Sequence, residues 1–223
     1  MRFKQIRCME DLISLIGQIG FLPYFKNEIP GFSIEETCLK ELWFTEIDGP
    51  WEWKSGIIQS KSCMYGKFFK NKAGYISRKW IPDFVNMRRD GYDFDALYDD
   101  GLAAHKDKQI FDTIAEEKEI LSTALKKKCN YSKGGNKGFD TVLNRLQMQG
   151  YVCIADFVDK RDKSGNVYGW ATARYTTPEN IFGYDYVTSA YKRDSSESRK
   201  CITEHIKKIL PDISEEIINK FIC

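Results

Sequence analysis

Apolar residues recur along the chain at two spacings, one typical of helices and one typical of strands. They follow the helical spacing in "MEDLISLIGQIG", and Gly20 and Pro23 predict the end of that helix. Two aromatic-rich runs then flank a glycine-containing turn in "CMYGKFFKNKAGYIS", which predicts a β-hairpin. The first part of the chain is therefore expected to consist of a helix and a hairpin.

The middle of the chain predicts three helices in succession. In the first, Ile110, Phe111 and Ile114 share one face. The second is short, begins at Ser122 as its N-cap and ends near Cys129. The third repeats apolar residues at i, i+3, i+4 and i+7, and a glycine follows its end. Its apolar stripe and the closing glycine are Phe139, Val142, Leu143, Leu146 and Gly150.

Two strands are expected after these helices. They are "YVCIADFV" and "VYGWATARY", separated by the polar turn "DKRDKSGN". Three helices followed by a two-stranded wing is the order of a winged helix, a relative of the helix-turn-helix. We therefore expect an α+β protein with a winged helix-turn-helix core at residues 106–176. An N-terminal helix and β-hairpin portion at residues 1–105 and a C-terminal helical segment at residues 177–223 are expected to pack on this core.

The composition is that of a folded chain with a sizeable core. Its 223 residues are 42% hydrophobic and 14% aromatic. No apolar stretch approaches 18 residues, so neither a membrane span nor a secretory signal is predicted, and we expect a cytoplasmic protein. Seven cysteines without a CxxC pair, with only two histidines, match no zinc spacing. We expect reduced, mostly buried thiols, no metal and no cofactor.

Three tryptophans lie between the first helix and the hairpin. Trp43, Trp51 and Trp53 are suited either to stacking on nucleobases or to anchoring helices against the hairpin. Large aromatic side chains dominate burial in small cores, which favours the second interpretation.

An acidic run follows the hairpin. From Asp90 to Asp100 the chain carries five aspartates and no base. A cluster of this kind can hold a hard cation, but the run lacks the pattern of a calcium-binding loop. Because Asp93 and Asp95 are placed as residues at a helix start are, an acidic helix cap is favoured over a metal site.

The outward side of the third helix carries residues that suit DNA. Asparagine and arginine read base edges, and the third helix of such a unit enters the major groove. From Lys118 to Arg145 there are seven bases and two acids, although the net charge of the chain is only +2. The glycines of "SKGGNKG" add backbone N–H groups near a helix N-terminus, where phosphate binds favourably. Double-stranded DNA is therefore the expected partner, and the predicted contacts are Lys133, Asn136, Lys137, Thr141, Asn144 and Arg145.

A protein-interaction module is an alternative interpretation of the same unit. Winged helices also bind proteins, and lysines at a helix end match the dipole of their own helix. The wing turn "DKRDKSG" is charge-balanced, which weakens a role in the minor groove. A module without nucleic-acid function would have an exposed apolar patch on the side of the third helix.

Several stretches together resemble a known family. They are "FLPYFKNEIPGFSIEE", "DGPWEWKSGIIQS", "YGKFFKNKAGYIS", "RRDGYDFDALYDDGLA", "LQMQGYV" and "YGWATARYTTPENIFGYDYVTSAYKRD". Across nearly the whole chain the sequence is similar to the bacterial AlkZ-related proteins, smaller relatives of the AlkZ/YcaQ family. The resemblance implies winged helices and a link to the repair of alkylated DNA. It also implies an alternative function, a monofunctional DNA glycosylase that excises alkylated or crosslinked bases.

The catalytic signature of the larger enzymes is Q-x-Q or Q-x-D, in which one polar residue positions the attacking water. Gln147-Met148-Gln149 matches it in letters but lies later in the chain than in the full-length enzymes. The resemblance thus implies Gln147 and Gln149 as candidate catalytic residues. Residues i and i+2 of a helix point about 200° apart, however, so only an extended segment directs both glutamines at one water. The alternative is a pair of solvated glutamines at a helix end.

A carboxylate is the other candidate for glycosidic chemistry, because it orients water or stabilises an oxocarbenium ion. The available residues, which the sequence does not rank, are Glu52, Asp90, Asp93 and Asp95. Arg88 and Arg89 precede the acidic run and are suited either to binding phosphate or to neutralising these acids.

Overall fold

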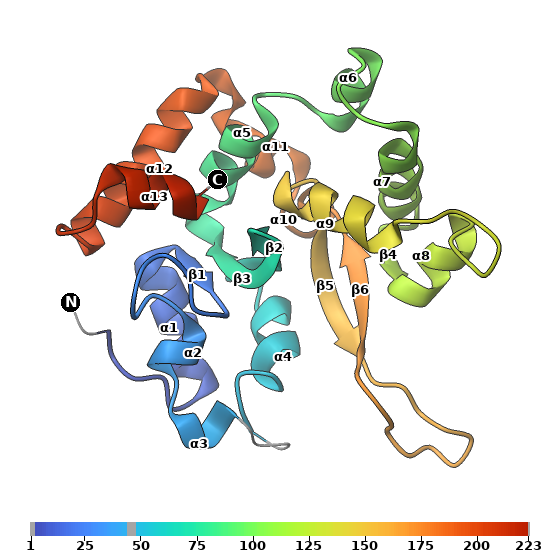
Figure 1. Ribbon diagram of the computed structural model, residues 1–223, viewed down its shortest axis with the longest axis horizontal. Coiled ribbons are helices and arrows are strands. Elements are labelled where there is room, and N and C mark those ends of the chain that lie inside the picture. The colour runs from blue at the N-terminus through green and yellow to red at the C-terminus, as the bar shows by residue number, and fades with distance from the viewer. Residues whose placement is uncertain (1–2, 44–47, 223) are drawn as a thin grey trace.

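The computed structural model describes residues 3–43 and 48–222 (Figure 1). The helices are α1 (Met9–Ile19), α2 (Ile34–Thr37), α3 (Lys40–Trp43), α4 (Trp53–Gln59), α5 (Ile81–Arg89), α6 (Phe94–Asp99), α7 (His105–Glu117), α8 (Ser122–Lys128), α9 (Phe139–Met148), α10 (Pro178–Phe182), α11 (Tyr184–Val187), α12 (Ser195–Ile209) and α13 (Glu215–Ile222). Two 3₁₀ turns are η1 (Arg78–Trp80) and η2 (Ser189–Lys192). The strands are β1 (Phe21–Pro23), β2 (Cys63–Phe69), β3 (Lys72–Ser77), β4 (Glu119–Leu121), β5 (Cys153–Val158) and β6 (Thr172–Thr176).

Within the described residues, the strands form one antiparallel sheet in the order β1-β3-β2-β5-β6-β4. Its two halves meet where Tyr65 of β2 pairs with Ile154 of β5. One half contains the predicted β2–β3 hairpin, and the other contains the predicted β5–β6 pair with β4 added at its edge. The mixed α+β class expected from the sequence is therefore confirmed.

Two hydrophobic cores lie on the two halves of this sheet. The first packs around the hairpin and includes α1, α5 and the C-terminal helices α12 and α13. The second contains the apolar faces of α7, α8 and α9, and Figure 1 shows these helices together at the other end of the molecule. Phe94 already belongs to the second core, and the expected boundary at residue 106 stays a prediction. Tyr151 and Val152 belong to the second core, and Cys153 and Ile154 of β5, which follow them directly, pack in the first, so this segment joins the two cores.

Helices α1, α7 and α9 form where the apolar period predicts them. The expected N-cap of α8 was wrong: Ser122 is its first helical residue, and Leu121 is the N-cap. In α1, Leu12, Leu15, Ile16 and Ile19 are buried, and Gly20 ends the helix with a φ of +81°. In α9 the buried side chains include all four members of the predicted stripe. Strand β4 was not predicted, because three residues between two helices are too few to show an alternating pattern.

The tryptophans and the acidic run have structural roles. Trp53 is buried, and Trp43 and Trp51 pack against the first core with ring centroids 5.5 Å apart. Asp93 is the N-cap of α6 and accepts a hydrogen bond from the backbone N–H of Ala96 at 2.8 Å. The core interpretation of the tryptophans and the cap interpretation of Asp93 are both confirmed.

All six described cysteines are free and four of them are buried, whereas Cys223 lies outside the described residues. No described helix is both long enough and apolar enough to cross a membrane.

Candidate nucleic-acid interface

Helix α9 is held between the second core and the β2–β3 hairpin. It begins after Gly138, whose φ of +86° lies in the left-handed region, and Gly150 with a φ of +77° follows its end. Its apolar stripe packs against α7, and its C-terminal half contacts β2. These contacts leave one side of the helix facing outward, and that side carries Thr141 and Asn144, two of the residues predicted to bind DNA.

Gln147 points inward and ties α9 to β2. Its side chain is fully buried: the Oε1 atom accepts a hydrogen bond from the backbone N–H of Lys67 at 3.1 Å, and the Nε2 atom donates to the Leu143 carbonyl at 3.3 Å. At Gly66 a Cβ atom would lie only 3.2 Å from Oε1 and 2.7 Å from the Phe68 ring, so glycine permits this close approach. Both ends of the Gln147 amide are therefore engaged in the fold.

The second glutamine of the Q-x-Q tripeptide does not lie beside the first. Gln149 follows the last residue of α9, remains helical with φ −78° and ψ −5°, and is partly exposed. The local backbone is thus the helical one in which the two side chains diverge. A catalytic role for this pair stays a prediction, and the burial of Gln147 argues against it.

The outward side of α9 presents Thr141 and Asn144. Thr141 is exposed and Asn144 partly exposed, and none of the described residues forms a hydrogen bond with either side chain. An amide in this state can donate and accept at once, as bidentate recognition of adenine requires.

Arg145 lies beside this face but already has a partner. Its Nε atom donates to Oδ2 of Asp107 at 3.0 Å, and its Nη2 atom donates to Oδ1 of the same carboxylate. This hydrogen bonding to Asp107 raises the pKa of Arg145. Asp107 is buried on α7, whereas the Arg145 side chain keeps 43% of its surface exposed. The pair anchors α9 to α7 and engages the Nε and Nη2 atoms of Arg145.

The glycine-rich turn before α9 forms a compact loop. The side-chain amide of Asn136 donates to the Cys129 carbonyl at 3.1 Å, so this residue closes the turn. At Gly135 a Cβ atom would lie 2.1 Å from the Asn130 carbonyl oxygen, a distance that excludes any other residue in this conformation. The turn therefore holds the start of α9 in a defined place.

The lysines around this turn divide into paired and unpaired groups. Lys128 forms an ion pair with Glu117, and Lys126 lies 3.8 Å from Asp140. From Lys118 to Arg145, four exposed lysines have no carboxylate partner among the described residues: Lys118, Lys127, Lys133 and Lys137. The local positive surplus predicted from the sequence is thus reduced by these ion pairs but keeps four free ammonium groups.

A long exposed arm connects β5 to β6. Residues 159–171 are all exposed, and Figure 1 shows this arm extending away from the body of the molecule. Asp162 accepts hydrogen bonds from the backbone N–H groups of Ser164 and Asn166 at its tip. Val167 and Tyr168 are more than half exposed, and Trp170 is 86% exposed. The sequence predicted "VYGW" as part of a strand, but these residues belong to the arm. The signal for this was that the aromatic run begins before the alternation of apolar residues that forms β6.

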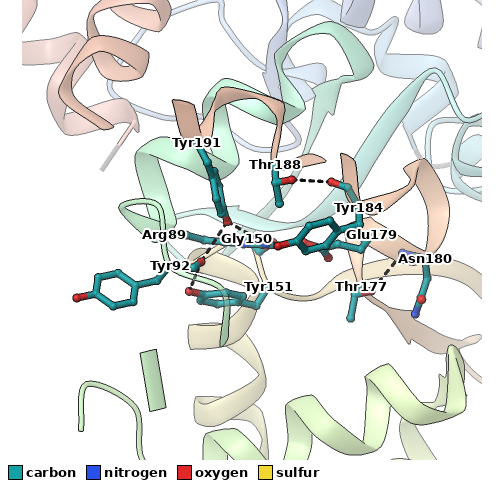
Figure 2. Close-up of polar contacts among 10 residues, drawn as sticks. All are labelled: Arg89, Tyr92, Gly150, Tyr151, Thr177, Glu179, Asn180, Tyr184, Thr188 and Tyr191. Carbon is teal, nitrogen blue, oxygen red and sulfur yellow. Dashed lines mark hydrogen bonds and ion pairs between the residues drawn. The ribbon is translucent and has the colours of Figure 1, made fainter. Parts of the chain in front are cut away.

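A buried arginine joins α5 to the end of α9 (Figure 2). Arg89 forms an ion pair with Glu179 of α10 and donates to the Gly150 carbonyl at 2.7 Å, and its guanidinium lies 4.4 Å from the Tyr151 ring centroid. The hydroxyls of Tyr151 and Tyr191 both donate to the Tyr92 carbonyl at 3.1 Å. The sequence left open whether Arg89 binds phosphate or neutralises the acidic run. Because Arg89 is buried in an ion pair with Glu179, it neither binds phosphate nor neutralises the acidic run.

The candidate carboxylates take part in local structure. Asp90 accepts a hydrogen bond from the Ser195 hydroxyl, Asp95 forms a 2.9 Å ion pair with Lys108, and Asp93 caps α6. Glu52 is exposed just before α4. No group of three histidine, cysteine, aspartate or glutamate side chains suited to a metal ion occurs among the described residues.

Comparison with known proteins places the chain in one family. The family model described as "AlkZ related" matches residues 6–223, which is nearly the whole chain. Neither the curated proteins nor the solved structures contain a match. Since the family model covers almost every residue of the fold and of the α9 surface described above, the chain belongs to the AlkZ-related family.

Proposed function

We propose that this protein binds double-stranded DNA, with α9 in the major groove and the glycine-rich turn against the phosphate backbone. The observation that carries the proposal is the outward side of α9 with the turn before it: in the part of the chain that the structure describes, Thr141 and Asn144 have no hydrogen-bond partner, and Lys133 and Lys137 have no carboxylate partner. Side chains of these types read base edges and neutralise phosphates, respectively.

The order of elements supports a winged helix as the scaffold of this surface. Helix α7, strand β4, helices α8 and α9, and strands β5 and β6 follow one another, and β4 pairs with β6. In a helix-turn-helix unit the second helix of the motif is presented to the major groove, and α9 has that place. The exposed arm at residues 159–171 takes the place of the wing.

Family membership supports a link to DNA repair. Base excision is the more specific activity that such a link suggests, and release of free base from a methylated duplex would demonstrate it. The burial of Gln147 makes binding the better supported function.

The salt dependence of duplex binding tests the proposal. Binding through phosphate contacts weakens with salt, with a slope of about −0.9 for each contact in a plot of log K against log salt concentration. We expect Lys133→Ala/Lys137→Ala to reduce the magnitude of that slope by about 2. Asn144→Ala should weaken binding to the preferred sequence by about 1–3 kcal/mol and leave the slope unchanged.

A matched control removes the same charge elsewhere. Lys40 on α3 and Lys220 on α13 lie on elements other than α9 and its turn, so Lys40→Ala/Lys220→Ala should keep the wild-type slope. Wild-type affinity and slope in the Lys133→Ala/Lys137→Ala variant would exclude α9 and its turn as the DNA contact.

The exposed arm gives a second, optical prediction. Trp170 is 86% exposed, while the other described tryptophans are buried or partly buried, so fluorescence quenching by added DNA should come mainly from Trp170. Trp170→Ala should change the free energy of unfolding by less than about 0.5 kcal/mol. On a duplex with a single-stranded end it should weaken binding by about 1–3 kcal/mol, the range for stacking on one base. Undiminished quenching in Trp170→Ala would show that the arm stays clear of DNA.

A further inference from the structure

A cavity of about 360 Å³ lies between the start of α5 and the 3₁₀ turn η2, on elements other than α9 and its turn. Its lining contains three basic side chains and one acidic side chain, together with Pro82, Ser189 and Ala190. The charged residues are Lys79, Asp83, Lys192 and Arg193. The cavity is open to solvent and lies within the size range of small-molecule sites.

Arg193 is fixed in the wall of this cavity. Its Nη2 atom donates to Asp83, and its Nε atom donates to the buried hydroxyl of Ser198 at 3.2 Å. The buried side-chain amide of Asn86 holds the same region by donating to Ser198 at 3.0 Å and to the Arg193 carbonyl at 3.2 Å. The Arg193 side chain still keeps 38% of its surface exposed. Its position is thus preorganised, so little side-chain entropy would be lost when a ligand binds.

The two lysines are not neutralised. Among the described residues neither Lys79 nor Lys192 has a carboxylate partner, whereas Asp83 already engages Arg193. The positive surface also extends beyond the cavity. Burial lowers the pKa of the adjacent His205, and the charges of Lys79 and Lys208 lower it further. Three cations around one engaged carboxylate leave a positive excess that attracts anions.

We propose that this cavity binds a phosphate group carried by a larger ligand, either a nucleotide or a strand of DNA. The fixed guanidinium supplies directional, charge-assisted hydrogen bonds to phosphate oxygens, and the two flexible lysines supply charge from either side. The volume leaves room for the part of the ligand that carries the phosphate. The site contains no residue of α9, so this proposal and the proposal of duplex binding by α9 can be disproved independently of each other.

Two binding measurements test the site on the full chain. In the first, dAMP is titrated at low salt into the wild type and into Lys79→Ala/Lys192→Ala, with 2′-deoxyadenosine as the ligand without phosphate. In the second, duplex DNA is titrated into the same two proteins. Both lysines are exposed, so the variant should keep the wild-type circular dichroism and melting temperature. The variant Lys40→Ala/Lys220→Ala is the control for removal of two charges.

If the ligand is a nucleotide, dAMP binds the wild type, 2′-deoxyadenosine does not, and the double variant weakens dAMP binding at least ten-fold. If the source is a DNA strand, dAMP binds weakly or not at all, and the double variant lowers the salt slope of duplex binding by about 2. Either result supports the site, and α9 variants leave the dAMP result unchanged. The proposal would be overturned if Lys79→Ala/Lys192→Ala gave the wild-type result in both titrations. It would also be overturned if this variant and the control variant bound dAMP equally well.

Discussion

Arg89→Ala is expected to lower the free energy of unfolding by about 3–5 kcal/mol, the range for removing one partner of a buried ion pair. The Arg89 side chain is 3% exposed and bridges Glu179 of α10 and the Gly150 carbonyl at the end of α9. Without the guanidinium, Glu179 keeps its charge in a largely buried place and the Gly150 carbonyl loses its donor. Urea denaturation followed by circular dichroism measures the loss.

The double variant Arg89→Met/Glu179→Leu distinguishes the contribution of the ion pair to stability from the contribution of side-chain packing at the same place. Replacing a buried ion pair with apolar residues of similar volume is often close to neutral. We therefore expect the double variant to recover most of the stability lost in Arg89→Ala. A matched exposed pair, Lys220 with Glu216 on α13, should give less than about 1 kcal/mol on Lys220→Ala. Equal small losses in Arg89→Ala and Lys220→Ala would show that the Arg89 network contributes nothing beyond a surface pair.

Local periodicity was sufficient to predict α9, because its buried stripe is determined by residues within two turns of one another. Phe139, Val142, Leu143 and Leu146 all pack inward as the spacing requires. The same spacing placed Arg145 outside the stripe, and the alternative of a solvated Gln147 at the helix end was wrong, because Gln147 is buried. Whether a polar side chain there is free depends on the partners that tertiary structure brings to it.

Those partners are distant in the sequence. The Gln147 acceptor is engaged by a backbone N–H 80 residues upstream, and Arg145 pairs with a carboxylate 38 residues upstream. Neither contact can be predicted from the spacing of apolar and polar residues within the helix. Asn144 and Thr141, one turn apart on the same side, have no such partners among the described residues. The sequence thus predicted the helix and its outward side, but not which polar residues on it remain available.

The exposed arm and the Arg89 network both have a burial that residue type does not predict: an aromatic side chain is exposed in the first, and a charged one is buried in the second. An aromatic residue such as Trp170 is usually buried, so a pattern that favours burial places it in a strand, whereas residues 159–171 contact little of the fold. Arginine is usually exposed, so the pattern gives no reason to bury Arg89. Its burial depends on Glu179, 90 residues further along the chain.

Gln147→Ala is expected to lower the free energy of unfolding by about 2–4 kcal/mol, because it opens a cavity at a fully buried side chain and leaves the partly buried Lys67 N–H without this acceptor. Gln149→Ala, two residues away and partly exposed, should change it by less than about 0.5 kcal/mol. Chemical denaturation of both variants, run beside a base-release assay on methylated duplex, distinguishes a structural Gln147 from a catalytic one. A catalytic glutamine predicts wild-type stability with loss of base release in Gln147→Ala. A structural glutamine predicts a lower free energy of unfolding in Gln147→Ala. If Gln149→Ala has nearly the wild-type free energy of unfolding, the loss is specific to Gln147, the side chain that ties α9 to β2.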